Sequence, residues 1–281
     1  MARLVVIAHE YDHFLRRKKH FWSKRTSSYL LHDVLRELEK LGHSWRLHRG
    51  GPPIDGDAAI LHVDSTIVDP KYIALGAHYP RTINFGTGDI SKRKISSLRL
   101  LPDDAWDGAV MVKANRNAKG GMEARHNRRA ERKGHPHPNP GVRLTGPYRV
   151  LGSIGEVSTA DWDDPDLIVE RYLPERAGDH YVIRTWVFMG SRERCTYQLA
   201  TDPIVKADKV IRYEACEVPE ELRAMREKLN FDFGKFDFVM HDGKPILLDT
   251  NRTPGVSLAI EQLMKGGARN LAEGLDELVG S

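Results

Sequence analysis

Cysteine is scarce in this sequence of 281 residues, which contains only Cys195 and Cys216. Two cysteines cannot supply a disulfide framework or a thiolate zinc cluster, so we interpret both as ordinary thiols. Long apolar runs are also lacking, since no segment approaches the roughly 20 apolar residues that a membrane helix requires. The start, Met1 to His9, has neither the cationic lead nor the long apolar stretch of a signal peptide. We therefore expect a globular, cytoplasmic protein without a membrane partner.

A net excess of positive charge is absent from most of the chain, although the formal net charge is +4. The stretch Arg125 to Arg143 holds six Lys or Arg against one acid, which leaves the remainder near neutral. Within it, the three prolines and the lack of periodicity of Arg125 to Gly141 predict a mobile loop or insertion. A local basic patch beside a cleft concentrates anions and predicts an anionic substrate, with a solvated insertion as the alternative. Nucleic acid is a disfavoured partner, because no aromatic and basic strand motif accompanies this charge.

Hydrophobic periodicity divides the chain into lobes. In residues 1–95, short apolar strands alternate with amphipathic helices, which predicts a small α/β domain. The predicted elements are strands at Arg3 to Ala8, Ala58 to Val63 and Thr82 to Phe85, and helices at Ser27 to Leu41 and Pro70 to His78. From Trp106 onward strand pairs dominate, so we predict an α+β unit over residues 96–281, with lobes at about 106–170 and 171–281.

A predicted hairpin near the C-terminus carries the most informative side chains. Its strands, Lys235 to Met240 and Pro245 to Thr250, flank an Asp242-Gly243 turn. Side chains alternate along a strand, so Asp249 and Asn251 share a face. Asp237 joins them if the loop has three residues, His241 to Gly243, with Gly243 in the left-handed conformation. A two-residue turn would put Asp237 on the opposite face.

Two carboxylates and an amide oxygen on one face suit a hard cation. Magnesium takes a few protein oxygens and completes its octahedron with water and phosphate. The set Asp237, Asp249 and Asn251 therefore predicts one or two magnesium ions, with manganese as an alternative, and a phosphate-bearing partner. The competing interpretation is a hairpin with exposed acids, and it is weakened because both aspartates lie within apolar strands.

These residues resemble the magnesium-binding strand pair of the ATP-grasp superfamily, in which an Asp is followed by Glu-x-Asn on the next strand. Upstream, the strand VMVK ending at Lys113 and the loop ANRNAKGG resemble the lysine and glycine-rich flap of that family. Glycine frees backbone N–H groups to close over phosphates, and a lysine supplies a compact charge. The resemblance implies nucleotide-binding roles for Lys113, Lys119, Gly120 and Gly121.

The segment LIVERYLPE, Leu167 to Glu175, resembles the hinge between the two ATP-grasp lobes. This implies that Glu170 and the backbone around Tyr172 and Leu173 bind the adenosine moiety. Asp179 matches the acid that holds the ribose hydroxyls. Lysine, hinge and metal hairpin occur in the order that the fold demands.

The resemblance implies an α+β ATP-grasp fold of two subdomains gripping ATP, preceded by a small Rossmann-like α/β domain. It also implies an ATP- and magnesium-dependent ligase that joins a carboxylate to an amine through an acyl phosphate. Arg184 or Arg252 is then expected to steady the transferring group or the substrate carboxylate. The strand after Gly178 and the Thr-Pro-Gly after Asn251 are similar to glutathione synthetase and ribosomal-protein glutamate ligases.

Two departures from the family pattern leave alternatives open. Asp249 replaces the usual Glu, and the family's second ATP lysine has no clear counterpart, with Arg149 or Lys119 as substitutes. The same sheet pair serves kinases that phosphorylate hydroxyls, and a non-catalytic ATP-binding or nucleic-acid-binding protein is a further reading. The substrates are expected to be small molecules or peptides, and a homodimer is the commonest default assembly.

Overall fold

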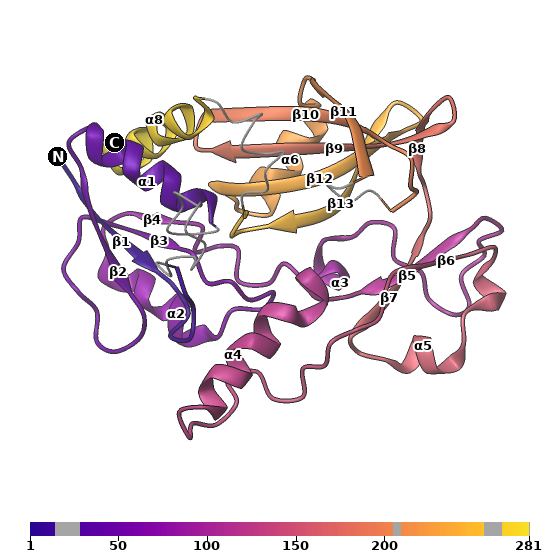
Figure 1. Ribbon diagram of the computed structural model, residues 1–281, viewed down its shortest axis with the longest axis horizontal. Helices are drawn as coiled ribbons and strands as arrows, with labels where there is room; N and C mark the ends of the chain where they lie inside the picture. Colours follow the sequence, from indigo (N-terminus) through magenta and orange to yellow (C-terminus); the bar gives the residue numbers. More distant parts are fainter. Residues whose placement is uncertain (15–28, 205–208, 256–265, 281) are drawn as a thin grey trace.

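Three β-sheets organise the chain in the computed structural model, which describes residues 1–14, 29–204, 209–255 and 266–280 (Figure 1). The N-terminal sheet is parallel with the order β2-β1-β3-β4. Its strands are β1 (Arg3–Ile7), β2 (Ser44–His48), β3 (Ala58–Leu61) and β4 (Thr82–Ile83). Helix α1 (Leu30–Lys40) connects β1 to β2, and α2 (Pro70–Ala74) with the 3-10 turn η1 (Leu75–His78) connects β3 to β4. The alternating α/β pattern predicted for this lobe is thus observed.

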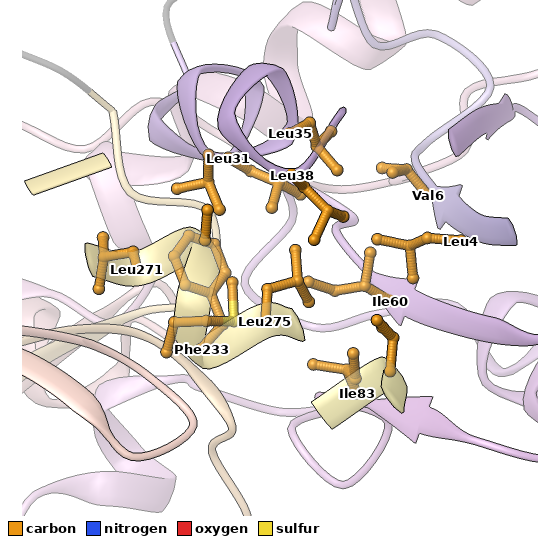
Figure 2. Close-up of a cluster of buried hydrophobic side chains, with 14 of the residues drawn as sticks. Leu4, Val6, Leu31, Leu35, Leu38, Ile60, Ile83, Phe233, Leu271 and Leu275 are labelled. Atoms are coloured by element: carbon orange, nitrogen blue, oxygen red, sulfur yellow. The ribbon is translucent and has the colours of Figure 1, made fainter. Parts of the chain in front are cut away.

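Both faces of the N-terminal sheet are buried, as expected for parallel strands covered by helices. Leu4 and Val6 of β1 face α1, whereas Val5 and Ile7 pack toward Tyr72 of α2. The last helix, α8 (Gly267–Gly280), lies beside α1 and joins the same core (Figure 1). Figure 2 shows Leu271 and Leu275 of α8 among leucines of α1 and the side chains of β1 and β3. The C-terminus of the chain therefore completes the core of its first lobe.

A small antiparallel sheet with the order β6-β5-β7 forms the middle lobe. Its strands are β5 (Val110–Ala114), β6 (Arg149–Leu151) and β7 (Leu167–Arg171). Short helical segments accompany it: α3 (Lys92–Ile95), η3 (Ile154–Glu156) and α5 (Thr159–Asp163). Val110 and Val112 of β5 pack with Val169 of β7 in one small core.

The third sheet is antiparallel with the order β11-β10-β9-β12-β13, and β8 also pairs with β9. Its strands are β8 (Glu175–Ala177), β9 (His180–Met189), β10 (Arg192–Ala200), β11 (Val210–Ala215), β12 (Phe233–His241) and β13 (Lys244–Asn251). Helix α6 (Glu220–Lys228) covers one face through Leu222, which packs with Trp186, Phe236 and Phe238. The opposite face of β9 and β12 is left for the first lobe and for the candidate site.

The stretch predicted as a mobile loop, Arg125 to Gly141, begins as a helix. Helix α4 (Gly121–Glu131) follows the 3-10 turn η2 (Asn117–Gly120) and buries Glu123, His126, Asn127 and Ala130. These positions have helical spacing, but three of them are polar, so a search for apolar periodicity could not find the helix. The segment after α4 is held against the helix at Asn139, because Asn127 donates to the Asn139 carbonyl (2.7 Å) and accepts from the Asn139 N–H (2.9 Å).

Helix α4 docks on the first lobe through a pair of stacked histidines. The rings of His126 and His9 lie 3.8 Å apart between centroids with an interplanar angle of 8°. Neither ring nitrogen of His126 has a hydrogen-bond partner within the described residues. Burial, reinforced by the charges of His9, Arg129, Arg125 and His13, lowers the pKa of His126 to about 2.

Replacing His126 with Phe should make folding less sensitive to acid. The unfolded chain takes up a proton on this histidine below about pH 6.5, whereas the folded chain does not until its much lower pKa. Below about pH 6.5, the wild-type free energy of unfolding should therefore fall by about 1.4 kcal/mol per pH unit relative to the variant. Urea unfolding at pH 7.5 and pH 5 measures this difference. Parallel profiles would contradict it, and a substitution of the exposed His78 with Gln serves as control.

Candidate active site

The hairpin that carries the predicted metal ligands turns in two residues. His241 pairs with Lys244, and the intervening Asp242 and Gly243 have φ values of 49° and 76°. Two successive left-handed residues match the hairpin turn whose twist suits β-strands, and Asp-Gly is a preferred sequence for it. The predicted three-residue loop is therefore wrong.

A β-bulge nevertheless brings the three predicted ligands onto one face. Asp237 lies directly opposite Asp249, but Phe238 lies opposite Leu247, so Leu248 is an extra residue in β13. The bulge shifts the alternation by one and cancels the effect of the even loop. Asp237, Asp249 and Asn251 consequently share a face with Lys235, which pairs with Asn251. The three predicted ligands therefore share one face as predicted, but the bulge at Leu248, and not a three-residue loop, places Asp237 there.

Lysines pair with each acidic side chain of the site. Lys235 Nζ lies 2.6 Å from Asp237 Oδ2, and Lys92 Nζ lies 3.0 Å from Asp249 Oδ1. Lys113 Nζ lies 2.6 Å from Glu170 Oε2 and donates to the carbonyl of the bulged Leu248 at 3.1 Å. These three lysines and three acids balance in formal charge, so each charged side chain of the site has an opposite charge beside it before any ligand enters.

Lys92 lines the site but was not predicted from the sequence. It is 1% exposed in α3, and Asn117 Oδ1 accepts a hydrogen bond from its Nζ at 3.0 Å. Burial is the largest single influence and lowers its pKa, but the charge and hydrogen bond of Asp249, together with the charges of Tyr148 and Glu170, outweigh it, so the pKa of Lys92 is raised and the side chain stays charged. Its flanking sequence, Ser-Lys-Arg-Lys, is typical of a solvated basic turn and gave no signal.

Asn117 links Lys92 to the hairpin that carries the predicted metal ligands, and it too was not predicted from the sequence. Its Nδ2 donates to the Thr250 carbonyl at 2.6 Å, while its own N–H donates to Thr66 Oγ1 at 3.0 Å. One side chain thus connects η2, α3 and β13. An Asn in a loop is common enough that its sequence context did not mark it.

The three acids, together with Lys92 and Lys113, line a cleft of about 220 Å³ between the middle sheet and the third sheet. The hinge segment Tyr172, Leu173 and Pro174 forms part of its wall. The remaining walls are largely apolar or aromatic and include Met111, Tyr148, Tyr181, Ile183, Pro203, Ile204, Val239 and Leu248. A charged end and an apolar end in one cleft suit a ligand with a polyanionic tail and a flat, weakly polar head.

The cleft gathers many of the predicted residues from distant parts of the sequence. Those that line it are Lys113, Glu170, Tyr172, Leu173, Asp237 and Asp249. Asn251 lies on the same face of the hairpin, where its Oδ1 accepts from the Thr253 N–H at 2.8 Å. Two carboxylates facing each other across a strand pair, with an amide oxygen two residues on, are a donor set that fits magnesium.

Four other predicted residues lie away from the cleft lining. Asp179 is exposed in the turn between β8 and β9. Lys119, Gly120 and Gly121 form the connection into α4, where Lys119 Nζ lies 5.8 Å from the centroid of the Tyr148 ring. Gly120 has a φ of 76°, and a Cβ there would lie 3.0 Å from the Arg143 carbonyl, so glycine is required by the backbone itself.

The structure does not bring Arg184 to the acids. It pairs with Phe238 in the sheet, one residue from Asp237, so its side chain leaves the opposite face. There its guanidinium binds Glu175, with Nη2 to Oε1 at 2.7 Å. Arg149, a suggested substitute for the second lysine, is also engaged elsewhere, because it binds Asp161 on the outside of the middle lobe.

Arg252 is 1% exposed and acts as a connector between lobes. Its guanidinium donates to the carbonyls of Val63, Ser65 and Thr87, in the loops that follow β3 and β4. Burial lowers its pKa to about 10, with Asp64 acting in the other direction. Since every donor atom faces a protein carbonyl, this geometry is that of a structural arginine.

Comparison with known proteins reveals no matching family model and no matching curated relative. Solved structures do match over nearly the whole chain. D-alanine–D-alanine ligase from Bacillus anthracis, complexed with ATP, has a TM-score of 0.53 at 14% identity, covering 99% of this chain and 97% of that one. The ATP-grasp ligase PsnB, complexed with a minimal precursor, Mg and ADP, has a TM-score of 0.54 at 11% identity, covering 98% and 97%. The chain has the ATP-grasp fold.

A third ATP-grasp structure agrees with this assignment. The RimK domain protein from Sphaerobacter thermophilus has a TM-score of 0.50 at 11% identity and covers both chains in full. The ATP-grasp fold predicted from the hairpin, hinge and lysine is confirmed. Within the described residues no helix is long and apolar enough to cross a membrane.

Proposed function

We propose that this chain is an ATP- and magnesium-dependent ligase that joins a carboxylate to an amine through an acyl phosphate, releasing ADP and phosphate. The observation that carries the proposal is the cleft that Asp237, Asp249, Lys92 and Lys113 line together beside an apolar hinge. The ATP-grasp neighbours named as ligases support the same reading.

In this proposal, different residues of the cleft bind different parts of ATP. Lys92 and Lys113 bind the phosphates, with Lys92 in the place of the second lysine that the family pattern requires. The apolar wall and the hinge backbone around Tyr172 and Leu173 bind the adenine. Both lysines are anchored by acids and carbonyls before the nucleotide enters. Such preorganised charges need little rearrangement during reaction, which is why they stabilise a transferring phosphoryl group effectively.

Asp237, Asp249 and Asn251 would hold magnesium, which when bound neutralises charge on the phosphates. The protein then has little covalent work to do, because phosphoryl transfer depends mainly on alignment and electrostatic stabilisation. The substrate carboxylate attacks the γ-phosphate, and an amine captures the acyl phosphate. Exposed Arg125, Arg128 and Arg132 on and just after α4 favour an anionic substrate.

An ADP-release screen against pooled amino acids and carboxylic acids tests the proposal. Active pools are then resolved by mass spectrometry of the product. Ligation predicts an amide together with ADP and free phosphate, whereas a kinase leaves the phosphate on its acceptor. Hydroxylamine added in place of the amine should give a hydroxamate, because it captures an activated acyl group.

Replacing Lys92 with Met should reduce the rate of ADP release by about 10²- to 10³-fold, because it removes one preorganised charge from the transferring phosphates. Lys94 of the same short helix is the matched control, since Lys94 is not among the residues lining the cleft. Equal loss in both variants would show that the effect comes from α3 as a whole.

A further inference from the structure

The two cysteines of the chain lie side by side on neighbouring strands. Cys195 of β10 and Cys216, which follows β11, have their sulfurs 3.1 Å apart. The register of β10 and β11 pairs Thr196 with Ala215, and the Cys216 N–H donates to the Cys195 carbonyl at 3.2 Å, so the two cysteines are the next opposed pair. Side chains of opposed residues share a face.

Backbone geometry permits a bond between these sulfurs. Directly opposed residues of antiparallel strands have Cα atoms about 4.5–5.5 Å apart. That spacing lies within the range of about 4.4–6.8 Å in which a disulfide closes without backbone movement. We propose that Cys195 and Cys216 are a reversible thiol–disulfide pair, in which Cys216 reacts with peroxide and Cys195 resolves the product.

The surroundings of the two thiols differ in the way that this division of labour requires. Cys195 is 4% exposed and packs with Trp186 and Phe236 in the core under α6, whereas Cys216 is half-buried. Arg184 lies against Cys216, and its other partner, Glu175, accepts a hydrogen bond from the Met240 N–H at 2.7 Å. A thiolate beside an arginine and reachable from solvent is the reactive kind of cysteine, whereas an apolar core keeps a thiol protonated.

Electrostatics reinforce the geometry. The hydrogen bond between Cys216 and Cys195, together with the charge of Arg184, lowers the pKa of Cys216 to about 7, although burial opposes the shift. The same hydrogen bond and burial raise the pKa of Cys195. Cys216 is therefore the thiol that ionises, whereas Cys195 keeps its proton.

The chemistry balances with a hydroperoxide as the oxidant. The Cys216 thiolate attacks a peroxide oxygen, breaking the O–O bond to give a sulfenic acid and, with hydrogen peroxide, hydroxide. The Cys195 sulfur then attacks the Cys216 sulfur, the S–S bond forms, and the sulfenic oxygen leaves as water. In total two thiols lose two hydrogens and one hydrogen peroxide becomes two waters. A dithiol reductant reverses the step by exchange.

The pair lies on the face of the third sheet opposite the acids of the cleft, because Cys195 is opposite Trp186 and Thr185 contacts Asp237. The reactivity proposed for the two cysteines therefore does not depend on what the cleft binds. It also gives Arg184 a role that its sequence position did not suggest, as a positioning residue for a thiolate.

Intact-mass analysis of the full-length chain tests the pair, since it contains no other cysteine. After equimolar hydrogen peroxide and then excess iodoacetamide, the expected species is an unalkylated monomer lighter by two hydrogens, and dithiothreitol should restore two alkylatable thiols. In Cys195→Ser, dimedone should trap a sulfenic acid at Cys216. Cys216→Ser should react with peroxide at least about tenfold more slowly, because its remaining thiol is protonated.

Arg184→Gln separates a specific role of the arginine from simple packing. Its Cys216 should be alkylated several-fold to about tenfold more slowly at pH 7, since one unit of pKa is a tenfold change in thiolate. Arg212→Gln, a change at an exposed arginine of β11, should leave the rate unchanged. Two alkylatable thiols after peroxide, a disulfide only between chains, or equal reactivity of the two single-cysteine variants would each overturn the proposal.

Discussion

Asp249→Ala is expected to abolish ATP turnover, with a fall of at least about 10³-fold in ADP release, equivalent to about 4 kcal/mol of lost stabilisation. Asp249 lies opposite Asp237 and also binds Lys92, so its loss removes a proposed metal ligand and frees the lysine that we propose to bind the phosphates. Asp237→Ala should behave similarly, although its partners are Lys235 and Thr185.

Asp242→Asn provides the matched control for these aspartates. It lies in the same hairpin but at the exposed turn, and Asn tolerates the left-handed conformation that Asp242 adopts. Turnover of this variant should stay near wild type. Magnesium titration monitored with a fluorescent ATP analogue adds a second readout, because Asp249→Ala should weaken the metal-dependent part of binding. Near-normal ADP release by Asp249→Ala would refute the metal assignment.

Arg252→Met is expected to lower the free energy of unfolding by about 3–5 kcal/mol, because breaking a buried charged network removes the arginine donor from the carbonyls of Ser65 and Thr87, whereas the Val63 carbonyl keeps the Ser65 N–H. Met keeps most of the apolar stem, so the change isolates the guanidinium. Arg252→Lys should recover little, because one ammonium cannot replace a planar fork that reaches three carbonyls.

Urea unfolding in the absence of nucleotide, followed by tryptophan fluorescence and circular dichroism, measures this effect. Arg212→Met is the control, since an exposed arginine with a single acidic neighbour should change stability by no more than about 0.5 kcal/mol. If Arg252→Met unfolds at the wild-type urea concentration yet loses turnover, the substrate-binding role predicted from the sequence is the correct one.

The fold could be predicted from local patterns wherever the buried face of an element is apolar. Alternation of short strands and helices predicted the first lobe, and the paired strands around Asp242-Gly243 predicted the hairpin. Helix α4 was not predicted, because its buried face includes the polar residues Glu123, His126 and Asn127. Strand β2 was not predicted, because it lies at a sheet edge, where only alternate side chains are partly buried.

The sequence by itself determined the hairpin acids, the hinge and Lys113, because ligand chemistry and strand alternation are written in neighbouring residues. Only the tertiary structure decided that Lys92 faces Asp249, that a bulge at Leu248 aligns the two aspartates, and that Arg252 is a connector. Each of these depends on contacts between segments far apart in the chain. Whether a charged side chain meets a ligand or a carbonyl is set by what the fold places opposite it, and no local pattern records that.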